Sequence, residues 1–97
     1  MPWERRLTSE GDAVRRYGYR AEILEILWRH GVHPTPTTPP ELVYAFVGDL
    51  HRYELRRLRD RLLNRDFPKL EYYSRVVEIR NRYRILALKP HQLVLGP

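Results

Sequence analysis

The feature that most constrains the fold is a long helical pattern in the middle of the chain. Between residues 40 and 64, apolar side chains recur at three- and four-residue spacing and fall in one sector of a helical wheel. They are Val43, Phe46, Val47, Leu50 and Leu58, with Leu55 and Leu62 beside them. Arg52, Arg56 and Arg59 fall on the opposite side. Because Pro40 is tolerated in a first helical turn, the pattern predicts a helix over residues 40–64.

Two further helices are predicted, one on each side of this segment. Residues 9–30 carry apolar side chains at four-residue spacing, with Ser9 as a candidate N-cap and Gly31 after the last periodic residue. Residues 68–83 begin with Pro68 in the first turn and continue with two apolar stripes.

Residues 32–40, VHPTPTTPP, form a Pro/Thr-rich connector that is stiff, because each proline restricts its own backbone and that of the preceding residue. We therefore expect an all-α fold, a three-helix bundle in one domain over residues 1–97. The C-terminal segment should pack on the third helix, with one short turn near Pro90. One alternative stays open: residues 76–88 could form a β-hairpin, because β-branched and aromatic residues occur on both arms.

The composition excludes several classes of protein. The 97 residues contain no cysteine, which excludes disulfides, zinc–thiolate centres and thiol nucleophiles. No run of about 20 apolar residues is present, and the charged residues 1–7 do not resemble a secretory signal. We therefore expect a cytoplasmic protein that makes no membrane contact.

The residue pattern gives little support for catalysis. Ser9 and Ser74 have no base nearby in sequence, and the five glycines form no phosphate-binding loop. His51 and Glu54 lie three residues apart, but a carboxylate metal site in a helical bundle needs such a pair twice. We expect no catalytic residue, no metal and no cofactor, and therefore a non-enzymatic protein with no evident small-molecule substrate.

The charge balance suggests one kind of partner. Eighteen basic residues against twelve acidic ones give a formal net charge of +6, which favours contact with phosphates or with an acidic protein. The candidate contacts are Arg52, Arg56, Arg59, Arg65, Arg75 and Arg82. Local ion pairs, such as Arg52 with Asp49, would neutralise part of this charge. Nucleic-acid binding through an arginine-rich face is therefore the second hypothesis.

The aromatic and apolar residues favour a protein partner or self-association as the first hypothesis. The predicted third helix and the tail LALKPHQLVLGP carry more apolar surface than a small bundle needs to bury. Tyrosine and arginine are frequent anchors of protein interfaces. The candidate interface aromatics are Tyr72, Tyr73 and Tyr83.

Glu54 lies where helical geometry disfavours a charge. It falls near the centre of the apolar sector of the helix over residues 40–64. Because a buried carboxylate requires a partner, we expect Glu54 to be at least partly buried and paired with an arginine. Arg57, three residues on, is the first candidate partner, and an arginine from another helix is the second.

Overall fold

The computed structural model describes residues 15–95 and confirms the all-α class. These residues form three α-helices: α2 (Ala21–Arg29), α3 (Pro40–Leu63) and α4 (Tyr72–Arg82). Three 3-10 helices accompany them: η2 (Lys69–Glu71), η3 (Arg84–Ala87) and η4 (Pro90–Leu93). Over residues 15–95 the strand-like pairing is limited to one isolated bridge, between Tyr19 and Val94.

Helix α3 is the scaffold of the molecule and ends one residue before its predicted boundary. Its 24 residues begin with Pro40 in the first turn and give a helix about 36 Å long. The chain leaves the helix at Asn64, and Arg65 then adopts a left-handed conformation with φ 61°. That conformation cannot continue a right-handed helix, so the chain turns back there.

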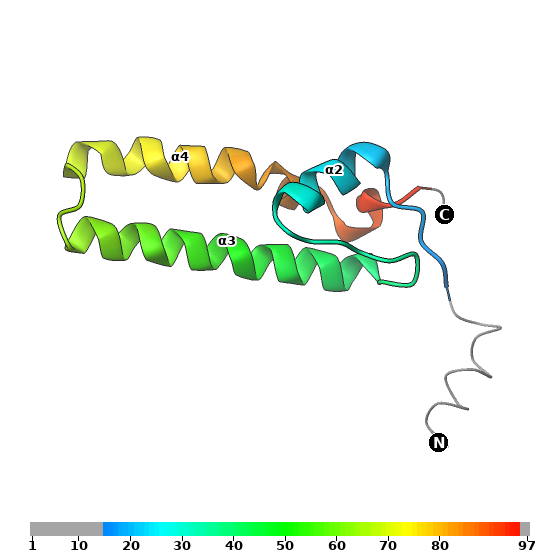
Figure 1. Ribbon diagram of the computed structural model, residues 1–97. Coiled ribbons are helices and arrows are strands. Elements are labelled where there is room, and N and C mark those ends of the chain that lie inside the picture. The colour runs from blue at the N-terminus through cyan, green and yellow to red at the C-terminus, as the bar shows by residue number, and fades with distance from the viewer. Residues whose placement is uncertain (1–14, 96–97) are drawn as a thin grey trace, which may run out of the picture.

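Helix α4 runs back along α3 to form a helical hairpin (Figure 1). Leu58, Phe67 and Ile79 are buried between the two helices. The predicted helix over residues 68–83 is observed as the 3-10 turn η2 followed by α4. The β-hairpin alternative for residues 76–88 is wrong, because this segment is helical up to Arg82 and continues into η3.

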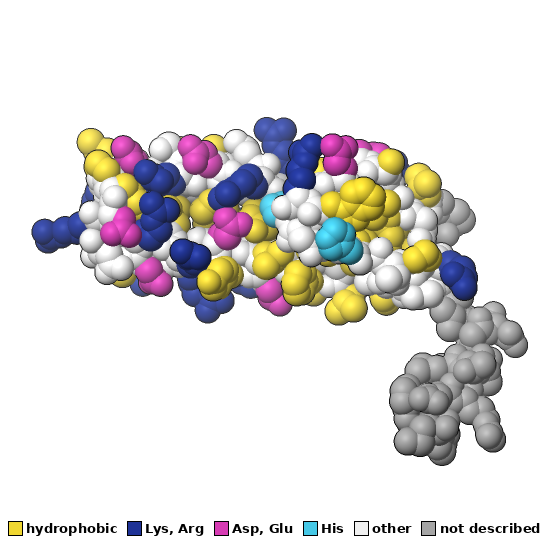
Figure 2. Space-filling view, in the orientation of Figure 1, with side chains coloured by type: hydrophobic (Ala, Val, Ile, Leu, Met, Phe, Trp, Pro, Cys, Tyr) yellow, Lys and Arg dark blue, Asp and Glu magenta, His cyan; other side chains and the backbone are white. Residues whose placement is uncertain are grey.

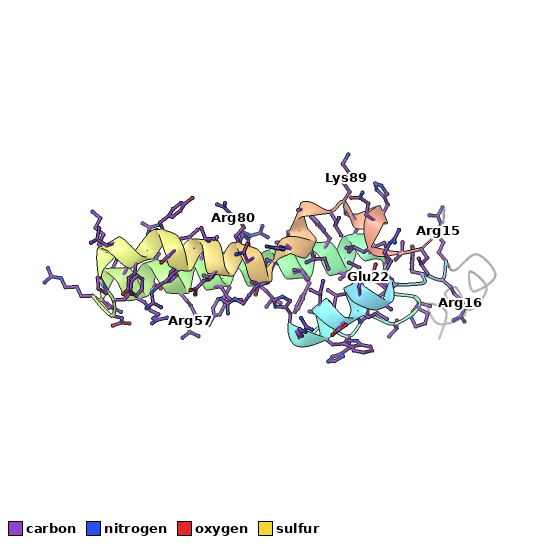
Figure 3. All side chains as sticks on the ribbon, turned by 90° about the horizontal axis from the view of Figure 1, so that it is seen from above. Arg15, Arg16, Glu22, Arg57, Arg80 and Lys89 are labelled. Atoms are coloured by element: carbon purple, nitrogen blue, oxygen red, sulfur yellow. The ribbon has the colours of Figure 1, made fainter. Side chains whose placement is uncertain are left out.

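Helix α2 and the C-terminal tail lie side by side over the N-terminal half of α3 (Figures 1 and 3). The least exposed side chains lie in this part: Leu27 from α2, Val47 from α3 and Leu93 from η4. The other half of α3 is paired with α4 alone (Figure 1). The fold is thus a helical hairpin whose open end is covered by α2 and the tail, rather than a bundle of three equal helices.

The first helix is shorter than predicted, because residues 15–20 are not helical. The backbone N–H of Leu95 donates to the Gly18 carbonyl at 2.7 Å, and that of Arg20 donates to the Leu93 carbonyl at 3.1 Å. These bonds to the tail replace helical ones, and Gly18 makes the helical alternative less favourable. Ser9, the predicted N-cap, lies outside the described residues.

The tail packs mainly on α3 and on residues 15–20. The sequence had predicted that it would pack on the third helix instead. The hydroxyl of Tyr44 on α3 donates to the Leu86 carbonyl at 2.8 Å. The turn expected near Pro90 is observed as η4. Among the described helices, none combines the length and the apolar character that a membrane span requires.

Candidate functional site

Glu54 is held by two groups from the end of α4. Its side chain is 29% exposed; its Oε1 accepts a hydrogen bond from the Arg82 guanidinium at 2.8 Å, and its Oε2 accepts one from the Tyr83 hydroxyl. Arg57 is not its partner. Arg57 lies instead beside the ring of Tyr53, 6.0 Å from its centroid. A residue three positions on is rotated by about 60° around the helix, so Arg57 lies at the edge of the face on which α4 packs, while α4 itself supplies both donors to Glu54.

Two histidines surround the Tyr83 ring. The His30 ring stacks on it with centroids 4.4 Å apart, and the His51 ring lies tilted at 5.2 Å. His30 Nε2 lies 2.8 Å from the Arg82 carbonyl. Because a carbonyl only accepts hydrogen bonds, Nε2 is the nitrogen that carries the proton. Glu54, Tyr83, Arg82, His30 and His51 therefore form a network that joins α2, α3 and the end of α4, and we call it the Glu54 network.

The contacts of the Glu54 network hold α2, α3 and the end of α4 together. Both carboxylate oxygens of Glu54 already have donors. Burial, followed by the hydrogen bond to Glu54, raises the pKa of Tyr83 above its ordinary value. A raised pKa keeps the phenol protonated, whereas a nucleophile or a general base would need the opposite shift.

The buried tyrosines make stability depend on alkaline pH. Burial raises the pKa of Tyr19 to about 12, and it also raises the pKa of Tyr83 above its ordinary value of 10.0. Above about pH 10 the unfolded chain loses phenolic protons that the folded protein keeps, so it binds fewer protons. The free energy of unfolding should therefore be unaffected by these groups below about pH 10 and should fall above it.

Urea unfolding at about pH 8, 10 and 11 measures this effect. Tyr83→Phe should make the alkaline decrease shallower. Tyr73→Phe is the control, because Tyr73 is 72% exposed and lies outside the Glu54 network. Equal alkaline slopes for Tyr83→Phe and the parent protein would contradict the assignment.

The structure separates the candidate contact arginines into two groups. Three form ion pairs: Arg52 with Asp49, Arg75 with Glu71, and Arg82 with Glu54. Arg75 also lies over the ring of Phe67, 4.3 Å from its centroid. The other candidates, Arg56, Arg59 and Arg65, are exposed and form no ion pair among residues 15–95.

The candidate interface aromatics do not form one surface. Tyr83 is a core residue with 4% exposure, so its predicted role at an interface is wrong. Tyr72 is half-buried against the core, and Tyr73 is exposed. The tail is also largely packed, with Ile85 and Leu93 buried. Within the predicted interface of the third helix and tail, Tyr83, Ile85 and Leu93 are therefore interior, whereas Leu70, Tyr73 and Leu95 are exposed.

An apolar surface that sequence reasoning missed lies on α2 and α3. Besides Leu63 at the far end of α3, four large side chains are more than half exposed there: Trp28 (53%), Leu42 (62%), Phe46 (52%) and Tyr53 (53%). The Trp28 ring stacks on His33 of the connector, with centroids 6.3 Å apart. We call these four residues and His33 the apolar surface. Hydrophobic side chains gather over α2 and the connector in the space-filling view (Figure 2).

A shallow groove of about 360 Å³ lies within the apolar surface. It is lined by Gly31, Val32, His33, Pro34, Thr38, Leu42, Val43 and Phe46. Periodicity assigned Phe46 to the core sector, but α2 and the connector cover only part of that sector. The exposed i, i+4, i+11 spacing of Leu42, Phe46 and Tyr53 is the signal that could have indicated a second apolar stripe.

A second groove follows the apolar surface along the hairpin. It has a volume of about 440 Å³ and is lined by Tyr53, Glu54, Arg57, Leu58, Arg61, Arg75, Glu78, Ile79 and Arg82. We call it the arginine groove. Tyr53 lines this groove and lies on the same side of α3 as Leu42 and Phe46, about 10 Å from Phe46 along the helix axis. Lys and Arg side chains are concentrated over the hairpin in the same view (Figure 2).

Metal ligands do not cluster in the described part of the chain. Over residues 15–95, no three His, Asp or Glu side chains come together in a way that could hold a metal ion. The fold and the two surfaces define an all-α protein in which an exposed apolar surface adjoins an arginine-lined groove. Comparison with known proteins adds no relative: no family model, no curated protein and no solved structure matches the chain.

Proposed function

We propose that the protein is a non-enzymatic binding module that holds a protein partner on the apolar surface. The observation that carries this proposal is the exposure of Trp28, Leu42, Phe46 and Tyr53 on adjoining elements. Single exposed apolar residues are ordinary on protein surfaces, whereas a contiguous group marks an interaction site. Tryptophan and tyrosine are also the residues that most often anchor interfaces.

The size of the apolar surface fits this role. An aromatic side chain buries roughly 150–250 Å² in full, so three half-exposed aromatic residues and one leucine present roughly 300–500 Å². The largest apolar patch of a monomeric protein falls in this range and is often functional. A standard interface covers about 800 Å² on each partner, so the patch supplies its apolar centre and the arginine groove extends it.

A partner other than a second copy of the chain is favoured by charge. The chain has a formal net charge of +6, and the arginine groove adjoins the apolar surface. Two copies that met through this face would bring their arginines together, and like charges at an interface are costly. The glutamates of the groove reduce this repulsion only in part.

Selection of peptides that bind the full chain tests the proposal. Phage-displayed random peptides of roughly 16 residues should yield binders, and Phe46→Ser should weaken their binding at least tenfold, because it removes the aromatic centre of the surface. Leu63→Ser is the matched control: Leu63 is 68% exposed on the same helix and lies about 25 Å away.

Circular dichroism would verify that both variants are folded. Binders that tolerate Phe46→Ser as well as Leu63→Ser would contradict the proposal. An absence of any enriched peptide would contradict it as well.

Nucleic-acid binding is the second candidate function. It is favoured by Arg56, Arg59 and Arg65, which are exposed and without an ion pair among residues 15–95. Such guanidinium groups are available to phosphate oxygens. Labelled RNA or DNA titrated at about 0.05 and 0.2 M salt would distinguish this candidate, because phosphate contacts make affinity fall steeply with salt. Absence of binding at the lower salt concentration would exclude it.

A further inference from the structure

We infer that the partner is an acidic segment, with an apolar anchor that fills the groove beside Phe46 and one or two carboxylates that bind in the arginine groove. This inference rests on the proposed function and specifies the chemistry of the partner. It is carried by Tyr53, which lines the arginine groove on the side of α3 that also presents Phe46, and by the charges of the arginine groove.

The arginine groove has an open position for a carboxylate. Arg82 and Arg75 are paired with Glu54 and Glu71 at 2.8 and 3.0 Å. Arg57 has no ion pair among the described residues, and Arg61 has only a long contact of 3.8 Å to Asp66. Arg57 and Arg61 are four residues apart on α3, so they lie on one side of the helix. Together they present two guanidinium forks of the kind that binds carboxylates.

Aromatic rings hold these guanidinium groups near the groove. The Arg57 group lies 6.0 Å from the centroid of the Tyr53 ring, and the Arg61 group lies 5.6 Å from that of Phe67. Contacts of this type reduce the number of rotamers that a long side chain explores. A bound carboxylate therefore costs less side-chain entropy here than on a freely mobile arginine.

The number of available cations distinguishes an acidic segment from a polyanion. The groove offers one unpaired and one loosely paired arginine, and Glu54 and Glu78 also line it. Nucleic acids carry a charge at every phosphate and bind where many cations are available. One or two carboxylates match the charge of the groove, whereas a run of phosphates would be repelled by the carboxylates of Glu54 and Glu78.

The spacing along α3 sets the spacing within the partner. Phe46 and Arg57 are eleven residues apart, so they are separated by about 16 Å along the helix axis. An extended segment covers this distance in about five residues, and a helical segment needs about eleven. The carboxylates should therefore follow or precede the apolar anchor at one of these two separations.

The peptides selected on the full chain also test this inference. The enriched peptides should combine an apolar anchor with Asp or Glu, and Arg57→Glu should weaken their binding at least tenfold. Arg80→Glu is the matched control, because it makes the same charge change on the opposite side of the hairpin (Figure 3) and should change affinity less than twofold. Replacing the peptide carboxylates by amides should reproduce the loss on the parent protein and should have little effect on Arg57→Glu.

The outcomes separate this inference from the proposed function. Peptides that require Phe46 but contain no acidic residue and tolerate Arg57→Glu would overturn the inference and leave the proposed function standing. Peptides that tolerate Phe46→Ser would overturn both. Sedimentation of the full chain tests whether a second copy of the chain occupies the apolar surface. A dimer that is lost in Phe46→Ser would show this and overturn the inference.

Discussion

Leu93→Ala is expected to lower the free energy of unfolding by about 2–5 kcal/mol, because it leaves a cavity in the centre of the core. Leu93 is 0% exposed, and its carbonyl accepts the hydrogen bond from the Arg20 backbone. The side chain belongs to a short 3-10 turn with little stability of its own, so the turn depends on this packing. A loss of this size is a large fraction of the stability of a small domain.

Urea unfolding followed by circular dichroism measures this difference. Leu95→Ala is the matched control, since Leu95 lies in the same tail but is 60% exposed. That variant should remain within about 0.5 kcal/mol of the parent protein. If Leu93→Ala and Leu95→Ala unfold at the same urea concentration, the tail does not pack as described.

Glu54→Ala is expected to cost about 1–3 kcal/mol of unfolding free energy, because it leaves the Tyr83 hydroxyl without an acceptor in the core. Arg82 adds less to the cost, since its side chain is 58% exposed and water can solvate its guanidinium. Glu54→Gln should cost less than Glu54→Ala, because the amide keeps an oxygen acceptor for Tyr83.

A double-mutant cycle isolates the pair. Because Glu54→Ala combined with Tyr83→Phe removes both partners, it should cost less than the sum of the single variants. Arg57→Ala should stay within about 0.5 kcal/mol of the parent protein, because Arg57 does not contact Glu54 in this structure. If Arg57→Ala lowered the free energy of unfolding as much as Glu54→Ala does, the Glu54–Arg57 pair expected from sequence spacing would be supported instead.

The helices of the hairpin could be predicted because their signals are local. The apolar period and Pro40 define α3, and its observed end at Leu63 differs from the prediction by one residue. Pro68 likewise precedes the turn that begins the second arm. The prediction of a helix over residues 9–30 was wrong at residues 15–20, where the backbone forms hydrogen bonds to the tail. A pairing between residues some 75 positions apart leaves no periodic signal in the sequence.

The candidate site was predictable only in part. The wheel identified Glu54 as a charge in an apolar sector, but its partners Arg82 and Tyr83 lie 28 and 29 residues away. It also treated Phe46 as core, because the wheel does not show how much of a sector the neighbouring elements cover. Trp28 follows the four-residue spacing of the predicted first helix, but it is exposed for the same reason.

The sequence by itself determined the all-α class, the positions of α3 and α4, the absence of cysteine chemistry and the excess of positive charge. These follow from composition and from interactions within a few residues, which are present in any conformation that forms the helices. The tertiary structure alone decided that Tyr83 and Leu93 are core, that Arg57 has no ion pair within residues 15–95, and that Trp28, Leu42, Phe46 and Tyr53 are exposed. The reason is that burial and ion pairing depend on which distant segment occupies each helix face, and that choice depends on how side chains from the whole fold pack together.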